Sequence, residues 1–318
     1  MRTLLFLIVA IVACTATAQD FPTRPIRFIV PYPPGGPADI LARAIAQKLG
    51  ERLRQQVVID NRPGGGANIG AEVAARAAPD GHTIFMMTST HASNMTLYAK
   101  PGYHALRDFA HITNIAAYPL LLVVHPGRVA APDVRALVAL AKAHPGKLSY
   151  GSAGTGGGAH FAGELFARLA GIEIVHIPYK GQGPALQDAI AGQIDLTFAS
   201  VSASLPHINA GRLRALGISS AERLPVLASL PTVAEAGVPG YELESWLGMS
   251  APAGTPPAIV RRLNEETAAV VADAEFAERL RRDGAAPRVS PPERFTAYVE
   301  AEVGRWAKLV RDAGVKQE

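Results

Sequence analysis

The sequence predicts an α/β protein built from two doubly wound lobes. Short apolar segments alternate with longer segments of helical periodicity along most of the chain, which is the pattern of a parallel sheet covered by helices. The 318 residues less a candidate leader of 18 leave about 300, more than a single hydrophobic core usually serves. Four glycine-rich loops stand where a strand gives way to a helix, and ligands bind doubly wound sheets at such junctions.

The first eighteen residues have the features of a cleaved export signal. Arg2 precedes a short apolar run that ends at Ala16–Ala18, a small-x-small pattern that signal peptidase recognises. The run is shorter than the about 20 apolar residues of a membrane-spanning helix, so we expect cleavage after Ala18 and an exported protein. The alternative is that Ile11–Cys14 is a lipoprotein box and that Cys14 becomes the lipidated first residue. Cleavage after Ala18 would remove the only cysteine, and with it any disulfide or zinc–cysteine site.

The composition argues against nucleic acid as a partner. The formal net charge is +4, and removal of Arg2 with the leader lowers it to +3. The sequence has no run of five or six basic residues, which nucleic-acid-binding segments commonly have. Glycine (30 residues) and proline (25 residues) are frequent, but 48% of the residues are hydrophobic. We therefore expect many tight connections in a folded chain rather than disorder.

In the first third of the chain, strands are expected where β-branched or apolar residues are bounded by Pro, Gly or Asp. These segments are Ile26–Val30, Val57–Ile59, Thr83–Met87 and Ile115–Val124. Leu41, Ile45, Leu49 and Leu53 recur every fourth residue, which predicts one buried stripe of an amphipathic helix. A shorter helix is expected over Ala71–Ala78.

The middle third repeats this alternation, and the last third is expected to be mostly helical. Helices are expected over Pro132–His144, around Phe161, Leu165 and Leu169, and over Ala185–Ala191; strands are expected over Leu148–Gly151, Ile174–Ile177, Leu196–Ala199 and Leu213–Ile218. Two more helices are marked by Ile259, Leu263 and Val270, and by Phe295, Val299, Val303, Trp306 and Val310.

We expect the chain to cross between the lobes twice, near Val124–Pro126 and near Ser219–Arg223. The first lobe would then comprise residues 19–125 and 223–318, and the second lobe residues 126–222.

The four glycine-rich loops are the candidate functional segments. They are Pro31–Asp39, Asn61–Gly70, Gly151–His160 and Pro178–Pro184. Glycine allows the backbone to approach a ligand closely. The helix that follows each loop offers free N–H groups and the positive end of its dipole. Two such loops in each half predict a cleft lined by backbone amides, and a carboxylate is the ligand that this lining suits.

Other chemistry finds less support. No loop has the G-x-x-x-x-G-K-[ST] pattern of a phosphate-binding loop, and Gly64–Gly70 only partly matches a dinucleotide fingerprint. Gly151–Gly154 lacks the spacing of a nucleophile elbow, and the nine histidines are scattered, so neither a hydrolase nor a zinc enzyme is expected. An exported hydrolase that uses Ser152 and His160 is kept as an alternative.

Single side chains in and near the loops each have a structural interpretation beside the functional one. Asp39 starts a helix and is more typical of a cap than of a ligand contact. His160 suits capping or packing, Lys180 is typical of a solvated lysine, and Asp195 suits either a turn at a strand edge or a contact between the lobes. For Trp246 we expect burial in the core.

These loops closely resemble the tripartite tricarboxylate transporter substrate-binding family, also called Bug receptors. The matching segments are Tyr32–Asp39, Asn61–Gly70, Tyr150–Gly156, His176–Gly181 and Gly192–Asp195. Their order and spacing agree over essentially the whole mature chain. The resemblance implies a type II periplasmic-binding-protein fold and a periplasmic, non-enzymatic receptor without a cofactor. It also implies capture of a di- or tricarboxylate, an acidic amino acid or an aromatic acid for an integral-membrane transporter.

By the same resemblance, backbone groups and ordered waters from both lobes would hold one carboxylate. The residues that would line the two walls are Tyr32, Pro34, Gly35, Gly36, Asp39, Asn61, Gly66, Ala67, Asn68, Thr88 and Ser89 in the first lobe and Gly154, Thr155, His160, Tyr179, Lys180 and Asp195 in the second. A monomer is expected. A receptor that reports to a sensor kinase instead of a transporter is the remaining alternative.

Overall fold

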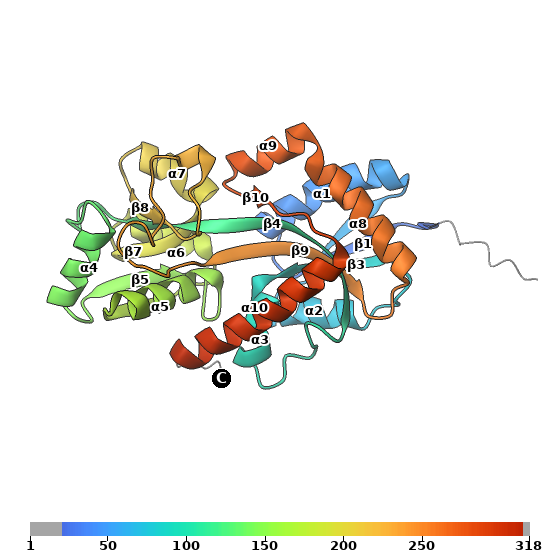
Figure 1. Ribbon diagram of the computed structural model, residues 1–318, viewed down its shortest axis with the longest axis horizontal. Helices are drawn as coiled ribbons and strands as arrows, with labels where there is room; N and C mark the ends of the chain where they lie inside the picture. The colour runs from blue at the N-terminus through green and yellow to red at the C-terminus, as the bar shows by residue number, and fades with distance from the viewer. Residues whose placement is uncertain (1–20, 314–318) are drawn as a thin grey trace, which may run out of the picture.

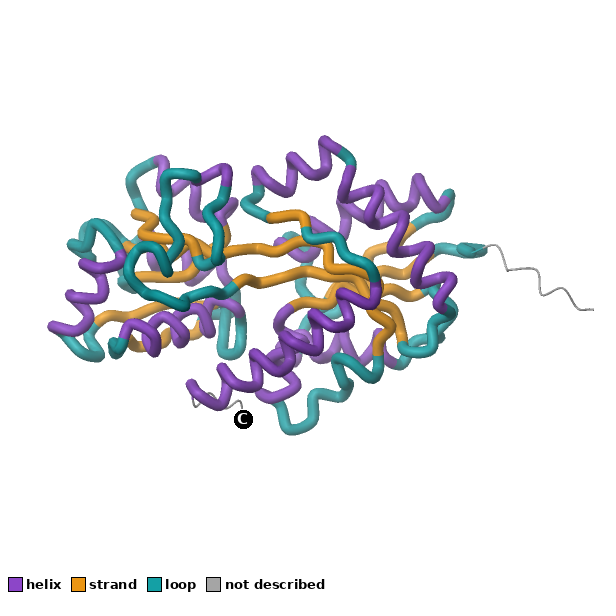
Figure 2. The backbone as a smooth tube through the Cα atoms, in the orientation of Figure 1, coloured by secondary structure: helices purple, strands orange, loops and turns teal. Residues whose placement is uncertain are grey.

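The computed structural model describes residues 21–313. The expected export signal and Cys14 therefore lie outside the described residues. Two groups of strands stand side by side, and two long strands, β4 (Phe109–Val124) and β9 (Glu244–Pro252), run between them (Figure 1). Helices cover the sheet on both faces (Figure 2). Within residues 21–313, no helix has the length and apolar character that crossing a membrane requires.

The first group of strands combines parallel and antiparallel pairs. Strands β2 (Val57–Asn61), β1 (Ile26–Val30) and β3 (Thr83–Thr88) are parallel neighbours. Strand β9 lies antiparallel to β3 and to the first part of β4. The short β10 (Ala286–Pro287) pairs with β4 on its other side.

The second group also combines parallel and antiparallel pairs. Strands β6 (Ile174–Pro178), β5 (Leu148–Ser152) and β7 (Leu196–Ser200) are parallel neighbours. The last part of β4, Leu120–Val124, lies antiparallel to β7 on one side and to β8 (Arg214–Ile218) on the other. Strand β4 therefore belongs to both groups and exchanges its partner after Pro119, which is still paired with Glu244 of β9.

Helices form two layers on opposite faces of the strands (Figure 1). One layer contains α1 (Pro37–Leu53), α6 (Gln182–Ile190), α7 (Val201–Asn209), α8 (Pro257–Ala272) and α9 (Ala274–Arg282). The other contains α2 (Asn68–Ala75), α3 (Ser89–Leu97), α4 (Val134–Ala143), α5 (Gly158–Ala170) and α10 (Pro292–Ala313). The 3-10 turns η1 (Gly65–Ala67) and η2 (Pro225–Leu227) complete the elements. Helix α1 begins at a proline, which suits the first helical position, and buries the predicted stripe.

The expected parallel strands are present in each group, as β2–β1–β3 and as β6–β5–β7. The antiparallel pairs of β4 and β9 were not expected; the chain leaves the first group in β4 and returns in β9, so these two neighbours run in opposite directions. Strand β9 was missed altogether: Gly248, two serines and a terminal proline leave it without the β-branched run that marks a strand. Strand β4 starts at Phe109 rather than Ile115. Its polar first residues, among them His111, Thr113 and Asn114, are buried although their types suggest a loop.

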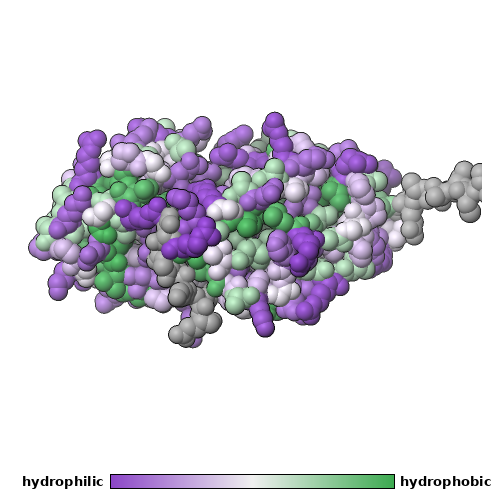
Figure 3. Space-filling view, turned by 60° about the horizontal axis from the view of Figure 1, so that its bottom comes forward, coloured by the Kyte–Doolittle hydropathy of each residue, from purple (hydrophilic) through white to green (hydrophobic). Residues whose placement is uncertain are grey.

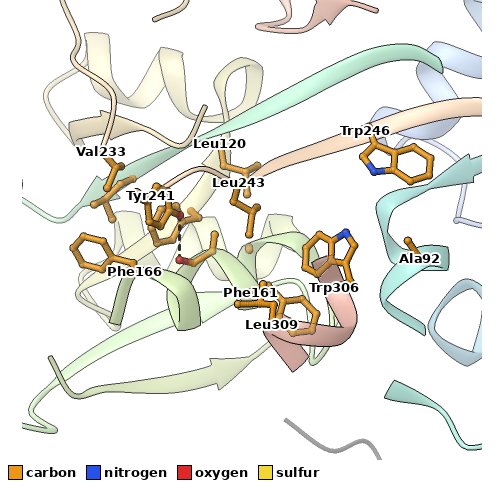
Figure 4. Close-up of a cluster of buried hydrophobic side chains, with 14 of the residues drawn as sticks. Ala92, Leu120, Phe161, Phe166, Val233, Tyr241, Leu243, Trp246, Trp306 and Leu309 are labelled. Carbon is orange, nitrogen blue, oxygen red and sulfur yellow. Dashed lines mark hydrogen bonds between the residues drawn. The ribbon is translucent and has the colours of Figure 1, made fainter. Parts of the chain in front are cut away.

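The largest hydrophobic cluster is continuous across both groups of strands on the α10 side. It includes Trp246, Phe161, Trp306 and Leu309 (Figure 4). On the opposite face the cores are separate, one beneath α1, α8 and α9 and one beneath α6 and α7. The surface of the α10 side shows apolar areas on both halves with hydrophilic side chains between them (Figure 3). The halves are thus joined by a shared core on one face only.

Both tryptophans lie in this shared core, as expected for Trp246. Trp246 is fully buried and Trp306 is 3% exposed. Their indole N–H groups donate to the same oxygen of buried Glu302, at 2.9 and 3.0 Å, which satisfies both donors without water. The Trp306 ring meets Phe161 of α5 edge-to-face, with centroids 4.8 Å apart. Helix α10 is therefore tied to β9 by Glu302 and to α5 by Trp306.

Candidate functional site

The directions of the strands place the glycine-rich loops opposite one another. Strands β1, β2 and β3 run the same way as β4, because β3 and β4 are both antiparallel to β9. Strands β5, β6 and β7 run against β4. The carboxyl ends of the two parallel sets therefore point toward each other across Tyr118 and Pro119, where β4 passes from one group to the other. Ligands bind open α/β sheets at such ends.

The first loop is held by the carboxylate of Asp39, which is 2% exposed. One of its oxygens accepts hydrogen bonds from the Gly35 N–H and from Arg43 Nε, both at 2.9 Å, and the other accepts from Asn61 Nδ2 at 2.9 Å. Asn61 Nδ2 also donates to the Tyr32 carbonyl at 3.0 Å. Burial acts to raise the pKa of Asp39, but these hydrogen bonds hold it below its ordinary value. Asp39 and Asn61 thus shape the loop, leaving Pro34 and Gly35 exposed and Gly36 half-buried.

The second loop also has a fixed conformation. Gly64, Gly65 and Gly66 all have positive φ, and the next residue, Ala67, does so as well at 74°. A Cβ at Gly66 would overlap the Tyr98 hydroxyl. Asn94 of α3 donates to the Gly66 carbonyl at 2.8 Å and to Asn68 Oδ1 at 2.7 Å. Gly66 itself is exposed, whereas Ala67 and Asn68 are buried.

The end of β3 joins the same wall. The Tyr32 hydroxyl lies 3.0 Å from Thr88 Oγ1 and donates to Thr90 Oγ1 at 3.2 Å. Burial raises the pKa of Tyr32, so the hydroxyl stays neutral. Thr88 and His91 form a capping box at the start of α3, and Ser89, the first helical residue, is buried. The residues predicted in this wall are therefore brought together.

In the opposite wall, two stacked histidines support the Gly151–His160 loop. Their rings have centroids 3.9 Å apart. His160 Nδ1 accepts the Gly156 N–H at 3.0 Å, and His176 Nε2 lies 2.7 Å from the Ser152 hydroxyl. The Ser152 oxygen in turn accepts the Gly154 N–H at 3.2 Å. Burial lowers the pKa of each histidine to about 4, so both rings are neutral near pH 7 and His160 can accept.

The Tyr179 loop lies against this one. The Tyr179 N–H donates to the Ser152 carbonyl at 3.0 Å, and a Cβ at Gly154 would stand 3.4 Å from the Tyr179 carbonyl. The Tyr179 hydroxyl donates to Asp188 at 2.7 Å, and burial together with Asp188 raises the pKa of Tyr179 to about 12. Thr155 and Lys180 are exposed.

Asp195 is not brought together with the other predicted residues. It precedes β7, and its backbone N–H bonds to Ser149 at the amino half of β5, whereas the glycine loop follows the carboxyl end of that strand. Its carboxylate is occupied by Arg128 at 2.9 Å and by the Ser149 N–H and hydroxyl at 2.8 and 2.9 Å. This arrangement fits the strand-edge interpretation.

A cavity of about 250 Å³ lies between the halves on the α1 side. Its walls come from the first turns of α1 and α7, from Tyr118 of β4, and from one face of α9. The lining residues are Pro37, Ile40, Leu41, Ala44, Tyr118, Ser202, Phe276, Arg279, Leu280 and Asp283. None of them is among the residues expected to line the two walls, although Pro37 lies within the first glycine-rich loop and Leu41 lies in the predicted stripe of α1.

Six helices begin at the carboxyl ends of these strands, three in each half. They are α1, α2 and α3 on one side and α5, α6 and α7 on the other. The first N–H groups of a helix have no partner within the helix and carry its partial positive charge. Such an arrangement can stabilise an anion without a basic side chain. Among the described residues, no group of three His, Cys, Asp or Glu side chains could hold a metal ion.

The geometry does not favour the hydrolase alternative. Ser152 is fully buried, and its hydroxyl contacts His176 and Gly154 rather than His160. A nucleophile has to reach its substrate. The Ser152–His176 pair therefore stabilises the conformation of the glycine loop.

Comparison with known proteins gives a consistent result. The family described as "Tripartite tricarboxylate transporter family receptor" matches residues 41–315. Protein BugT of Bordetella pertussis is 35% identical over 314 residues, covering 98% of this chain and 96% of BugT.

Solved structures agree with the fold over nearly the whole chain. R. palustris Rpa4515 with adipate has a TM-score of 0.86 at 41% identity, covering 93% of this chain and 99% of its own. Periplasmic binding protein BugD has a TM-score of 0.82 at 34% identity, covering 94% and 100%. MatC from Rhodopseudomonas palustris with bound malate has a TM-score of 0.80 at 31% identity, covering 91% and 100%.

Proposed function

Because this chain belongs to the tripartite tricarboxylate transporter receptor family, we propose that it is a periplasmic receptor that captures a small carboxylate between its two lobes. It then presents the loaded form to the membrane subunits of a transporter. The mature protein begins after Ala18, acts as a monomer and carries out no catalysis. In this proposal the chain passes from the first lobe to the second within β4, near Pro119, and returns at the start of β9, near Glu244. The return bound of 223 expected from the sequence shifts accordingly, because the Val233 and Leu243 N–H groups still donate to the Ile218 and Ser219 carbonyls of the second half.

The observation that carries this proposal is the meeting of two sets of helix N-termini and glycine loops across the middle of β4. An anion near one helix N-terminus gains about 0.3–1 kcal/mol when exposed and up to about 2 kcal/mol when partly buried. Several termini from both lobes would therefore hold a carboxylate without an ion pair. The solved relatives hold adipate and malate, and both are carboxylates.

Capture would involve closure of the lobes about their shared core. The halves are joined through α10 on one face and have separate cores on the other, so a hinge motion can change the cleft while the α10 side stays packed. Closed and open forms then present different surfaces to a membrane partner. Because both tryptophans of the chain lie at the joint, their fluorescence should report closure.

The test is a thermal-unfolding screen of the mature protein with mono-, di- and tricarboxylates. A ligand at one hundred times its Kd should stabilise the fold by about 2.7 kcal/mol. Isothermal titration should give one site per chain, and the tryptophan fluorescence should change with the same Kd. If no carboxylate in a broad panel shifted the melting temperature, the proposed function would be wrong.

A further inference from the structure

We infer that the interlobe cavity between α1 and α9 receives an apolar body carried by the bound acid, so that this receptor selects carboxylates with an aliphatic chain or ring over short, hydroxylated acids. This inference rests on the proposed function and specifies its ligand. The residues that determine the selectivity are Ile40 on α1 and Phe276 on α9, with Ala44 at the far end of the α1 wall.

Two apolar helix faces form the walls of the cavity. On α1 the lining residues Pro37, Ile40, Leu41 and Ala44 follow the i, i+3, i+4, i+7 spacing of one helix face. On α9, Phe276 and Leu280 are one turn apart and face the same cavity. Six of the ten lining residues are therefore aliphatic or aromatic hydrocarbon.

Ile40 shows that this surface lacks a partner in the protein. Its side chain is 44% exposed although it lies between the lobes beside a cavity. Burying an isoleucine side chain contributes favourably to any association that covers it. An apolar ligand group placed here would cover Ile40, whereas a ligand hydroxyl that faces the apolar sides of α1 and α9 would have no partner there.

The charges in the cavity favour an uncharged occupant. Arg279 and Asp283 are one turn apart on the α9 face, and their formal charges cancel. The remaining polar groups are the hydroxyls of Tyr118 and Ser202. Burial raises the pKa of Tyr118, so it carries no charge. The lining thus has no net charge to attract a second carboxylate, unlike the helix N-termini next to it.

The cavity is continuous with the proposed carboxylate site. Pro37 is the first residue of α1, directly after the Gly35–Gly36 turn, and Ser202 lies in the first turn of α7. A carboxylate at these helix starts leaves the rest of its molecule pointing along α1, where Pro37 to Ala44 spans about 10 Å at 1.5 Å per residue. Lobe 2 closes this side, because Gly284 packs so tightly on Val201 that a Cβ would overlap it.

The experiment is a titration series with straight-chain monocarboxylates from acetate to octanoate, with malate as the short hydroxylated acid. Each added CH2 that is buried should strengthen binding about fourfold, which follows from about 0.8 kcal/mol per methylene. The affinity should rise with length until the cavity is full, and malate should bind more weakly than hexanoate. Two variants test the location: Ile40→Ser should weaken the dependence on length, and Ala44→Leu should lower the affinity for the longer acids by more than the affinity for acetate.

Leu169→Ser is the matched control, because Leu169 is similarly exposed, at 39%, but lies on α5 away from the cavity. It should leave the whole series unchanged. A flat series in the wild type, or a length dependence that survives both cavity variants in folded protein, would overturn the inference while the receptor function stood. Failure of every acid to bind would instead refute the proposed function.

Discussion

Truncation of Asp39 is expected to loosen the first wall of the cleft without removing a ligand contact. The carboxylate holds the Gly35 N–H, Arg43 Nε and Asn61 Nδ2, all at 2.9 Å, and is 2% exposed. The carboxylate is thus buried and occupied by three donors of the protein itself. Asp39→Ala should therefore act on the shape of the loop and on the stability of the fold together.

The magnitude follows from the two hydrogen bonds that Gly35 and Asn61 lose when the carboxylate is removed. A hydrogen bond to a charged group contributes about 1.5–3 kcal/mol. Because water can reach the exposed Gly35 and the half-buried Asn61 after truncation, we expect a loss of about 2–3 kcal/mol rather than the full sum. Arg43 is exposed and adds little. The displaced loop should weaken carboxylate binding about tenfold, or about 1.4 kcal/mol.

Urea unfolding and isothermal titration measure the two effects. Glu278→Gln is the control, because Glu278 is exposed and its ion pair with Arg281 is 3.5 Å long; it should change stability by less than about 0.5 kcal/mol. Tighter binding by Asp39→Ala would show that the carboxylate faces the anionic ligand and repels it. That result, or unchanged stability, would refute the scaffold role.

The remaining predictions concern the glycines and the histidine stack. Gly66→Val should weaken binding and also cost about 1–3 kcal/mol of stability, since φ is +62° and the Tyr98 hydroxyl occupies the Cβ position. Gly154→Val should likewise lose affinity and about 1–3 kcal/mol of stability, because φ is +130° and the Tyr179 carbonyl lies 3.4 Å from the Cβ position. Affinities equal to wild type in both variants would show that the loops are turns only. His160 and His176 have their pKa lowered to about 4 from about 6.5, so the unfolded chain binds protons first and stability should fall as the pH drops from about 6.5 toward 4. Melting temperatures across that range should show a shallower slope in His160→Gln; an identical slope would contradict a neutral, buried ring.

Local patterns predicted much of the fold. The Ile26–Val30 strand is a short apolar segment, and α1 repeats leucine or isoleucine every fourth residue. The structure has both elements where expected. Strand β9 could not be predicted in the same way, because Gly248 in its middle has low strand propensity and is required by close packing: a Cβ there would overlap Phe295 of α10. Such a constraint depends on a partner far away in the sequence.

In the site, too, local features could be predicted from the sequence and long-range contacts could not. The glycine loops can be recognised in the sequence from their composition, and the strand directions place them opposite one another. The roles of single residues in the site could not be predicted from the sequence. Asp195 forms an ion pair with Arg128 away from the loops, and the Asp39 carboxylate accepts hydrogen bonds from Gly35 and Asn61. The cavity was not foreseen, because it depends on the approach of α1 and α9, two helices from opposite ends of the chain.

A crystal structure of the mature protein with an acid selected by the thermal screen would test the central claim most directly. The account predicts that one carboxylate accepts hydrogen bonds of about 2.7–3.2 Å from peptide N–H groups of both lobes, directly or through ordered water, at the starts of helices such as α1, α3, α5 and α7. A carboxylate held by the side chain of an arginine or lysine, or touching one lobe only, would contradict it.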